Sequence, residues 1–228
     1  MKLSAVIITL NEEKNIAECL AALKFADEVL VVDGGSHDRT CDLARQAGAK
    51  VFSRKFDDFS SQKNFAVSQA RGEWVFSIDA DERVPDFLAS EVLETIAGPN
   101  AHEAYRIHRR TRILGREFRF SGLQDDAPVR LFRKEKAFFV QPVHETVEVR
   151  GSTGDLKNYL EHRSFQTMSE HRKRLELYTS LEALPREGSP RPGLQDLCLR
   201  PVRRFFKIYV RGQGFRDGFE GLLYAWLS

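Results

Sequence analysis

Four short apolar runs mark the first third of the chain. Each is rich in Val, Ile or Phe and too continuous for a half-solvated strand, so we predict buried parallel strands. Between them, apolar residues recur at helical spacing in residues 16–23, 43–47 and 65–70. Alternating strands and helices are typical of a doubly wound α/β sheet. The four runs are "SAVIITL" (4–10), "EVLVVD" (28–33), "KVFSR" (50–54) and "EWVFSID" (73–79).

A different pattern follows. Pro85 opens a further helix, and from residue 104 apolar and polar positions alternate, which predicts a mixed, more antiparallel region. Thr167 and Glu170 then form a candidate capping box for another helix. We therefore predict an α/β domain over residues 1–165 and a helical, basic extension over residues 166–228. The alternating segments are "AYRIHRRTRI", "PVRLFRK", "AFFVQPV" and "ETVEVR".

The predicted extension contains a break and a basic segment. "LPREGSPRPG" (184–193) is rich in Pro and Gly and interrupts the helical pattern. The segment after it interleaves apolar and aromatic residues with cations, and "GLLYAWLS" at the end is typical of a helix that is cut short. Such a segment can lie in the headgroup region of an anionic membrane or pack as an amphipathic helix on the first domain. The cations are Arg200, Arg203, Arg204, Lys207 and Arg211.

Composition narrows the class of protein. With 228 residues, 42% of them hydrophobic, the chain can bury a substantial core. Its cysteines, Cys19, Cys41 and Cys198, are widely spaced and odd in number, which favours a reducing cytosol over a disulfide framework. No run approaches the roughly 20 apolar residues that span a bilayer. The start "MKLSAVIITLNEE" is better explained as a strand than as a signal peptide.

Polar residues follow the predicted strands directly. In an open α/β sheet, ligands bind beyond the carboxyl ends of the strands, so these residues are candidates for a binding site. The turn after the first strand has no glycine, which argues against the glycine-rich turn of a dinucleotide-binding fold. NAD is therefore not expected. The polar residues are Thr9, Asn11, Glu12, Asp33, Asp79 and Asp81.

Asp79 and Asp81 are two residues apart at a strand end, so they lie on the same side. Two carboxylates held this close both stay ionised when a cation joins them. Carboxylate oxygens suit Mg²⁺ or Mn²⁺, which often bridge a protein to a diphosphate. The alternative is that these acids, with Glu82, only provide negative charge at the start of the helix near Pro85.

The order and spacing of several motifs resemble family 2 glycosyltransferases, the nucleotide-sugar transferases of the GT-A fold. The motifs are "VIITLNEE", "VVDGGSHDRT", "SQKNFAVSQARGEWVFSIDADERV" and "PVRLFRKEKAFFVQPVHETVEV". Within the family, the chain is similar to the bacterial branch of lipopolysaccharide core β-glucosyltransferases. The resemblance implies an inverting, metal-dependent transfer of a hexose, glucose from UDP-glucose, to a lipopolysaccharide core or other lipid-linked acceptor.

The resemblance also implies roles for individual residues. Thr9, Asn11 and Glu12 would line the nucleotide pocket, and Asp33 would meet the uracil base. The family commonly has a second acid after this position, where the chain has Gly34. The remaining assignments are Lys63 and Asn64 near the nucleotide or its phosphates, Asp79 near the ribose or the metal, Asp81 as direct ligand of Mn²⁺ or Mg²⁺, and Arg130 near a phosphate.

Transfer also requires a base that removes the proton of the acceptor hydroxyl. We favour Glu145, with its neighbour His144 as a diphosphate or metal contact. The runner-up is Asp125, or its neighbour Asp126, in "GLQDDAPVR".

A lipid-linked acceptor favours the membrane interpretation of the basic extension over a nucleic-acid surface, which would use the same residue types. We therefore expect a peripheral protein on the cytoplasmic face of the inner membrane and no nucleic-acid partner. One alternative is a transferase with a protein or another small acceptor. The rival enzyme class is a nucleotidyltransferase acting on a sugar phosphate. Such an enzyme normally has a glycine-rich, basic loop after its first strand, and "TLNEEKN" is acidic and has no glycine.

Overall fold

The computed structural model describes residues 1–99, 101–142, 145–182 and 194–227. His144 and the predicted break at 184–193 lie outside these residues. The chain divides into two compact units, Met1–His108 with Ala127–His162, and Arg109–Asp126 with Arg163–Ser228. The second unit thus includes residues 109–126, which the sequence analysis placed in the first domain. The boundary at residue 165 stays a prediction.

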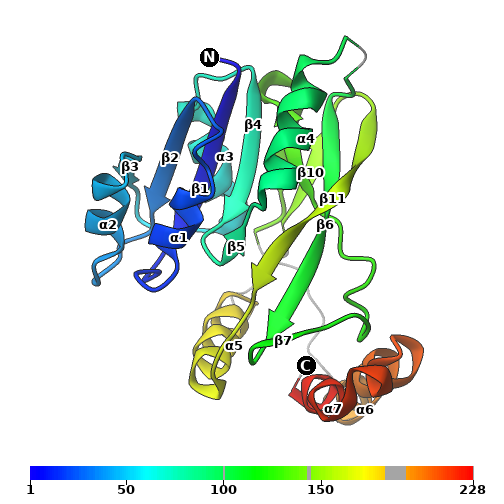
Figure 1. Cartoon of the computed structure of the whole chain (residues 1–228). Helices are drawn as coiled ribbons and strands as arrows, with labels where there is room; N and C mark the ends of the chain where they lie inside the picture. The colour runs from blue at the N-terminus through cyan, green and yellow to red at the C-terminus, as the bar shows by residue number, and fades with distance from the viewer. Residues whose placement is uncertain (100, 143–144, 183–193, 228) are drawn as a thin grey trace. The chain divides into compact units, whose positions relative to one another are not determined.

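The four apolar runs form the parallel half of the sheet in the first unit (Figure 1). Their order is β3-β2-β1-β4, with β1 between β2 and β4, and every pairing among them is parallel. Both faces of β1, β2 and β4 are covered, so these three strands need continuous apolar sequence, whereas β3 lies at the edge of the sheet with Lys50 and Ser53 exposed. The bounds are β1 Leu3–Thr9, β2 Glu28–Asp33, β3 Lys50–Ser53 and β4 Trp74–Asp79.

The sheet continues beyond β4 in the order β8-β6-β11-β5. β8 pairs antiparallel with both β4 and β6, as the alternating pattern predicted. β5 and β11 were not predicted. β5 has only two residues, and the apolar residues that β11 buries, Leu156 and Leu160, are four positions apart, a spacing that a strand shares with a helix. The bounds are β8 Val129–Arg133, β6 Ala104–Ile113, β11 Thr153–Arg163 and β5 Glu82–Arg83.

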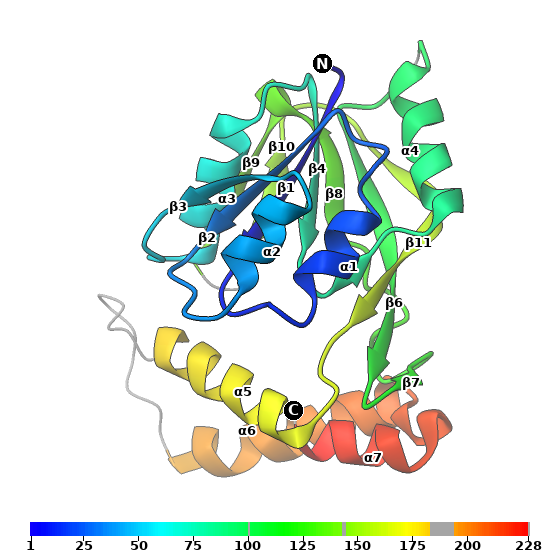
Figure 2. The ribbon, with the colours of Figure 1, turned by 60° about the vertical axis from the view of Figure 1, so that its left-hand side comes forward.

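Helices cover both faces of this sheet (Figure 2). One hydrophobic cluster joins Leu3, Ala5 and Ile7 of β1 to α1, α2 and α4. The other joins Val6 of β1 to α3 and to a separate hairpin of β9 and β10. The doubly wound α/β prediction is confirmed. The bounds are α1 Ile16–Ala21, α2 Thr40–Gln46, α3 Phe59–Gln69, α4 Asp86–Ala97, β9 Ala137–Val140 and β10 Thr146–Val149.

The second unit contains helices around a small apolar cluster that includes Ile113, Phe118 and Phe165. One half of the predicted capping box is present, since the Glu170 backbone N–H donates to Thr167 Oγ1. The Glu170 carboxylate accepts from the N–H of Gln166, the residue before the cap. No helix among the described residues is long and apolar enough to cross a membrane. The bounds are β7 Arg116–Glu117, α5 Met168–Glu182, α6 Leu194–Phe206, a π-helical turn Lys207–Arg211, a 3₁₀ turn Gly214–Asp217 and α7 Gly218–Leu227.

Candidate functional site

Three neighbouring strands bring polar residues to one edge of the sheet. In the parallel register, Thr9 lies opposite Asp33 on β2, and Ile8 lies opposite Asp79 on β4. The carboxyl ends of β1, β2 and β4 therefore lie at nearly the same level. This edge is where the fold places a ligand, and it is where the sequence placed the candidate residues.

Asp33 is buried at the end of β2. Its carboxylate accepts hydrogen bonds from Thr9 Oγ1 (3.2 Å), the Gly35 N–H (3.0 Å), and the Ser36 N–H (2.9 Å) and Oγ (2.5 Å). Burial raises the pKa of Asp33, but the bonds from Ser36 and Gly35 outweigh burial and hold this pKa below its usual value. Asp33 is thus an ionised acceptor that orders the turn after β2. Its predicted contact with uracil stays a prediction.

Asn11 and Glu12 join the turn after β1 to the turn after β2. The Asn11 N–H donates to Ser36 Oγ, and its side-chain carbonyl accepts from the His37 N–H. Asn11 has φ 56°, a left-handed conformation that Asn tolerates better than most residues. The Glu12 N–H donates to Thr40 Oγ1. These residues therefore fix the shape of the edge beside Asp33, and their predicted nucleotide contacts stay predictions.

A buried lysine lies between two of the predicted acids. Lys63 of α3 is 3% exposed. Its Nζ lies 3.0 Å from Asp79 Oδ1 and 2.6 Å from Glu145 Oε1, so it joins the end of β4 to the residue before β10. Burial lowers the pKa of Lys63, but Asp79 and Glu145 outweigh burial and raise this pKa above its usual value. Lys63 is therefore part of the buried site and does not lie on a solvated face of α3.

Arg130 of β8 binds the other side of Asp79. Its Nη2 lies 2.5 Å from Asp79 Oδ2 and 2.6 Å from Glu82 Oε1, and Glu82 Oε2 accepts the Asp79 N–H at 2.9 Å. Burial raises the pKa of Asp79, but Arg130 and Lys63 outweigh burial and hold this pKa well below its usual range. A phosphate at Arg130, as predicted, would have to compete with these two carboxylates.

The position of Glu82 differs from one interpretation of the sequence. Its side chain is fully buried, and it lies in β5 opposite His162 of β11. α4 begins at Asp86 after Pro85, which makes no side-chain cap. The alternative that Glu82 belongs to the start of this helix is therefore wrong. We call Lys63, Asp79, Glu82, Arg130 and Glu145 the charge cluster.

Asp81 faces a histidine that the sequence analysis did not identify. The Nε2 atom of His162 lies 3.5 Å from Asp81 Oδ2, and both side chains are largely buried. His162 was missed because β11 was not predicted. The signal available in the sequence was weak, since the apolar positions of β11 do not alternate with polar ones.

The donor atoms at this edge limit how a metal could bind. Among the described residues, no group of three or more His, Cys, Asp and Glu side chains is arranged to hold a metal ion. Both oxygens of Asp79 are bound by Lys63 and Arg130. Asp81 and His162 together offer a carboxylate and an imidazole, which suit a first-row divalent ion. The residues present therefore fit a divalent metal that Asp81 and His162 would hold.

The other predicted residues are not members of the charge cluster. The side-chain amide of Asn64 makes two hydrogen bonds to the backbone of Phe139 on β9, each of 2.8 Å: its Nδ2 donates to the Phe139 carbonyl, and its Oδ1 accepts from the Phe139 N–H. Asp125 and Asp126 belong to the second unit, where Asp125 is exposed and Arg109 binds the carboxylate of Asp126. The charge cluster consists of first-unit residues only.

Comparisons with known proteins agree on the family. A model of glycosyl transferase family 2 matches residues 4–147. The lipopolysaccharide core biosynthesis glycosyltransferase LpsC of Rhizobium meliloti (strain 1021) is 30% identical over 244 residues, which cover 100% of this chain and 90% of LpsC.

Two solved structures share the fold. The crystal structure of S. aureus TarS in complex with UDP-GlcNAc has a TM-score of 0.56 and 18% identity, and covers 99% of this chain and 79% of that one. Glucosyl-3-phosphoglycerate synthase from Mycobacterium tuberculosis, in complex with Mn²⁺, UDP and glucosyl-3-phosphoglycerate, has a TM-score of 0.50 and 18% identity, and covers 82% of each chain. The GT-A fold is confirmed. Since the family model spans more than half of its residues, this chain is an enzyme that belongs to glycosyl transferase family 2.

Proposed function

We propose that this enzyme transfers a hexose, glucose from UDP-glucose, to a hydroxyl group of a lipopolysaccharide core or another lipid-linked envelope glycan, with inversion at the anomeric carbon. The observation that carries the proposal is the common edge of Thr9, Asp33 and Asp79, with Asp81 and His162 beside it. The name of LpsC supports the acceptor, and the complexes of TarS and the mycobacterial synthase are in keeping with a UDP-sugar.

The charge of the site supports metal dependence. Three carboxylates, Asp79, Glu82 and Glu145, face two cations, Lys63 and Arg130, and Asp81 adds a further negative charge beside them. A diphosphate is repelled by such an edge. Asp81 and His162 would hold Mn²⁺ or Mg²⁺, which neutralises the charge of the departing diphosphate.

The charge cluster gives its members different tasks. Lys63 and Arg130 hold Asp79 ionised, and a third of the Asp79 side chain (33%) remains exposed, where it can meet the ribose. Lys63 also orients Glu145, the proposed base. Proton removal by a positioned carboxylate leaves the acceptor oxygen free to attack the anomeric carbon on the face opposite the diphosphate.

A thermal-shift screen with UDP-glucose, UDP-GlcNAc, UDP and UTP, each with and without Mn²⁺, tests the proposed function. We expect UDP-glucose to raise the melting temperature only when Mn²⁺ is present, because a ligand that binds the folded state stabilises it by mass action. If no nucleoside diphosphate stabilises the protein under any condition, the proposal is wrong. Stabilisation by UTP alone would favour the nucleotidyltransferase instead.

Glu145→Gln tests the base. We expect kcat to fall by about 10²- to 10⁴-fold, the usual contribution of general base catalysis, while the dissociation constant for UDP-glucose changes little, because Lys63 keeps its contact with Asp79. The matched control is Glu148→Gln, a substitution at an exposed position of β10 that should leave kcat unchanged. Full turnover in Glu145→Gln would exclude this base, and Asp125→Asn, measured in parallel, would then show whether the runner-up takes its place.

A further inference from the structure

The second unit exposes a row of large apolar side chains. On α6 and the π-helical turn they recur every three or four positions, which places them along one side of the helix. The same spacing continues from the 3₁₀ turn through α7, where Phe219 is 72% exposed and Trp226 is 75% exposed. We call these residues the apolar face: Leu199, Val202, Phe206, Val210, Phe215, Phe219, Leu222 and Trp226.

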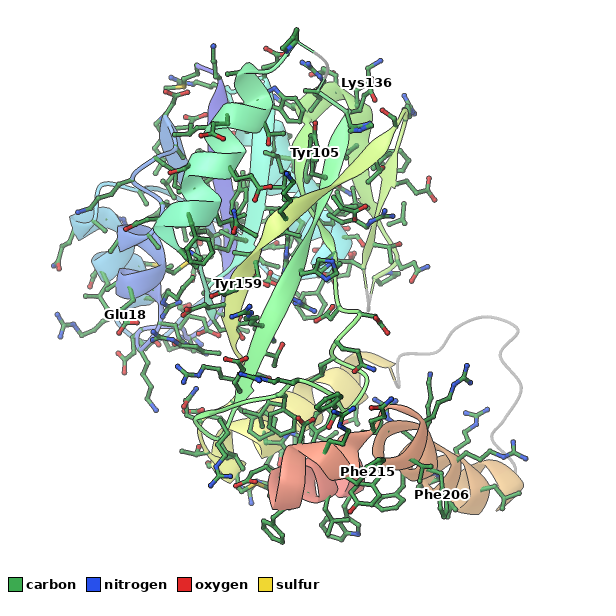
Figure 3. The ribbon with its side chains drawn as sticks, turned by 45° about the vertical axis from the view of Figure 1, so that its right-hand side comes forward. Glu18, Tyr105, Lys136, Tyr159, Phe206 and Phe215 are labelled. Atoms are coloured by element: carbon green, nitrogen blue, oxygen red, sulfur yellow. The ribbon has the colours of Figure 1, made fainter. Side chains whose placement is uncertain are left out.

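Ring contacts connect the two halves of the apolar face. Phe206 contacts Phe205 (5.7 Å between ring centroids), Phe205 stacks on Tyr209 (5.4 Å), and Tyr209 meets Phe215 (6.3 Å). Figure 3 shows Phe206 and Phe215 on the same outer side of the α6 and α7 layer. The apolar face is therefore continuous from α6 to the turn that leads into α7.

The opposite side of α7 faces the interior of the unit. Gly221 and Ala225 of α7 are buried, and Tyr224 packs its ring on Phe118 (5.6 Å). Since α7 already uses one side for packing, its part of the apolar face is a second, separate apolar surface. A surface of this kind on a folded protein usually marks an interaction site.

Cations flank the apolar face, and the acidic side chains of the same segment are bound by other groups of the second unit. Arg203, Lys207 and Arg211 are exposed beside the α6 half of the face. Of the two acids after residue 199, Asp217 accepts hydrogen bonds from the loop at residues 119–121, and Glu220 pairs with Arg116 (3.1 Å). The charge presented next to the apolar face is therefore positive.

We propose that the apolar face binds the surface of an anionic lipid bilayer, with its aromatic residues inserted at the headgroup level and the flanking cations on lipid phosphates. Phe and Trp on one side of a helix with Lys and Arg beside them are the features of an interfacial membrane helix. A protein partner would not require the row of cations. This inference concerns where the enzyme works and does not depend on the sugar that it transfers.

The test is flotation of the full chain with vesicles of phosphatidylcholine alone or with about 30% phosphatidylglycerol, a fraction in the range of anionic bacterial membranes. We expect the protein to float with the anionic vesicles only, and increasingly weakly as salt is raised, since salt screens the cations. Absence of flotation with anionic vesicles at low salt, or equal flotation with both vesicle types, overturns the proposal.

Two variants test the two components separately. Phe219→Gln with Trp226→Gln should weaken vesicle binding at least about tenfold, because two exposed aromatic side chains no longer insert. Arg203→Glu with Lys207→Glu should weaken it at least about 20-fold, since each cation near an anionic surface contributes roughly 1 kcal/mol. The matched controls, Leu93→Gln on α4 and Lys24→Glu with Lys157→Glu, change exposed residues of the first unit and should bind as the original protein does.

A second copy of the chain is the competing occupant. Sedimentation velocity of the protein without vesicles tests for such a dimer. If Phe219→Gln with Trp226→Gln abolishes a dimer and leaves vesicle binding unchanged, the apolar face serves self-association and not lipid binding. Stabilisation by UDP-glucose and Mn²⁺ should be the same in all these variants. Failure of lipid binding and failure of the proposed function are thereby separate results.

Discussion

Replacing Arg130 with methionine is expected to lower the free energy of unfolding by about 3–5 kcal/mol. The guanidinium of Arg130 is the cation that binds both Asp79 and the fully buried Glu82. In the variant, the buried Glu82 carboxylate loses the positive charge of Arg130. Removing one partner of a buried ion pair is far more destabilising than removing one partner of an exposed pair. Urea unfolding followed by tryptophan fluorescence or circular dichroism measures the change.

Arg133→Met on the same strand is the matched control. Arg133 is partly exposed, pairs with the exposed Glu73 and lies over the ring of Trp74 (4.6 Å), so its removal should lower the free energy of unfolding by no more than about 1 kcal/mol. Adding Glu82→Gln to Arg130→Met should recover part of the loss, because the buried charge is then removed as well. Equal destabilisation by Arg130→Met and Arg133→Met would contradict the role of the charge cluster in stability.

Asp81→Asn is expected to reduce kcat/KM by about 10³-fold, which corresponds to roughly 4 kcal/mol of lost transition-state stabilisation. The substitution keeps the shape of the side chain and removes the charge that the proposed Mn²⁺ or Mg²⁺ requires. It should also raise the Mn²⁺ concentration needed for half-maximal activity. Initial rates measured against both UDP-glucose and Mn²⁺ separate these effects.

His162→Gln provides the second half of this experiment. If Asp81 and His162 hold the same ion, the double variant should lose little more activity than the more impaired single variant, because residues that act as a unit are not additive. Asp155→Asn is the control on the same strand as His162: Asp155 is exposed and pairs with Arg106, and its loss should change kcat/KM less than about twofold. Unaltered Mn²⁺ dependence in both Asp81→Asn and His162→Gln would rule out the proposed metal site.

The sequence predicted the parallel half of the sheet well, for a physical reason. Strands buried on both faces must be apolar throughout, so β1, β2 and β4 appear in the sequence as short uninterrupted apolar runs. β11 is partly exposed and was missed, and with it His162. A site residue at the end of a strand could thus be predicted only when the strand itself was predicted.

The pairing of charges could not be predicted from the sequence. Asp79 and Asp81 were expected to act on one metal, because the sequence does not show which cationic side chains lie next to two neighbouring carboxylates. In the structure, Lys63 and Arg130 reach Asp79 from α3 and β8, and Glu145 joins Lys63 across 82 residues of chain. The packing of α3 against β9 brings Lys63 to Glu145, and the pairing of β8 with β4 brings Arg130 to Asp79.

Asn64 has a consequence for the solubility of the protein. Among the residues that the structure describes, β9 pairs with β10 on one side only. Its other edge would expose backbone groups that can pair with a strand of another molecule. The side-chain amide of Asn64 has the same donor and acceptor as a peptide group, and it occupies both the N–H and the carbonyl of Phe139 on that edge. Helix α3 therefore acts as a cover that protects this strand from aggregation.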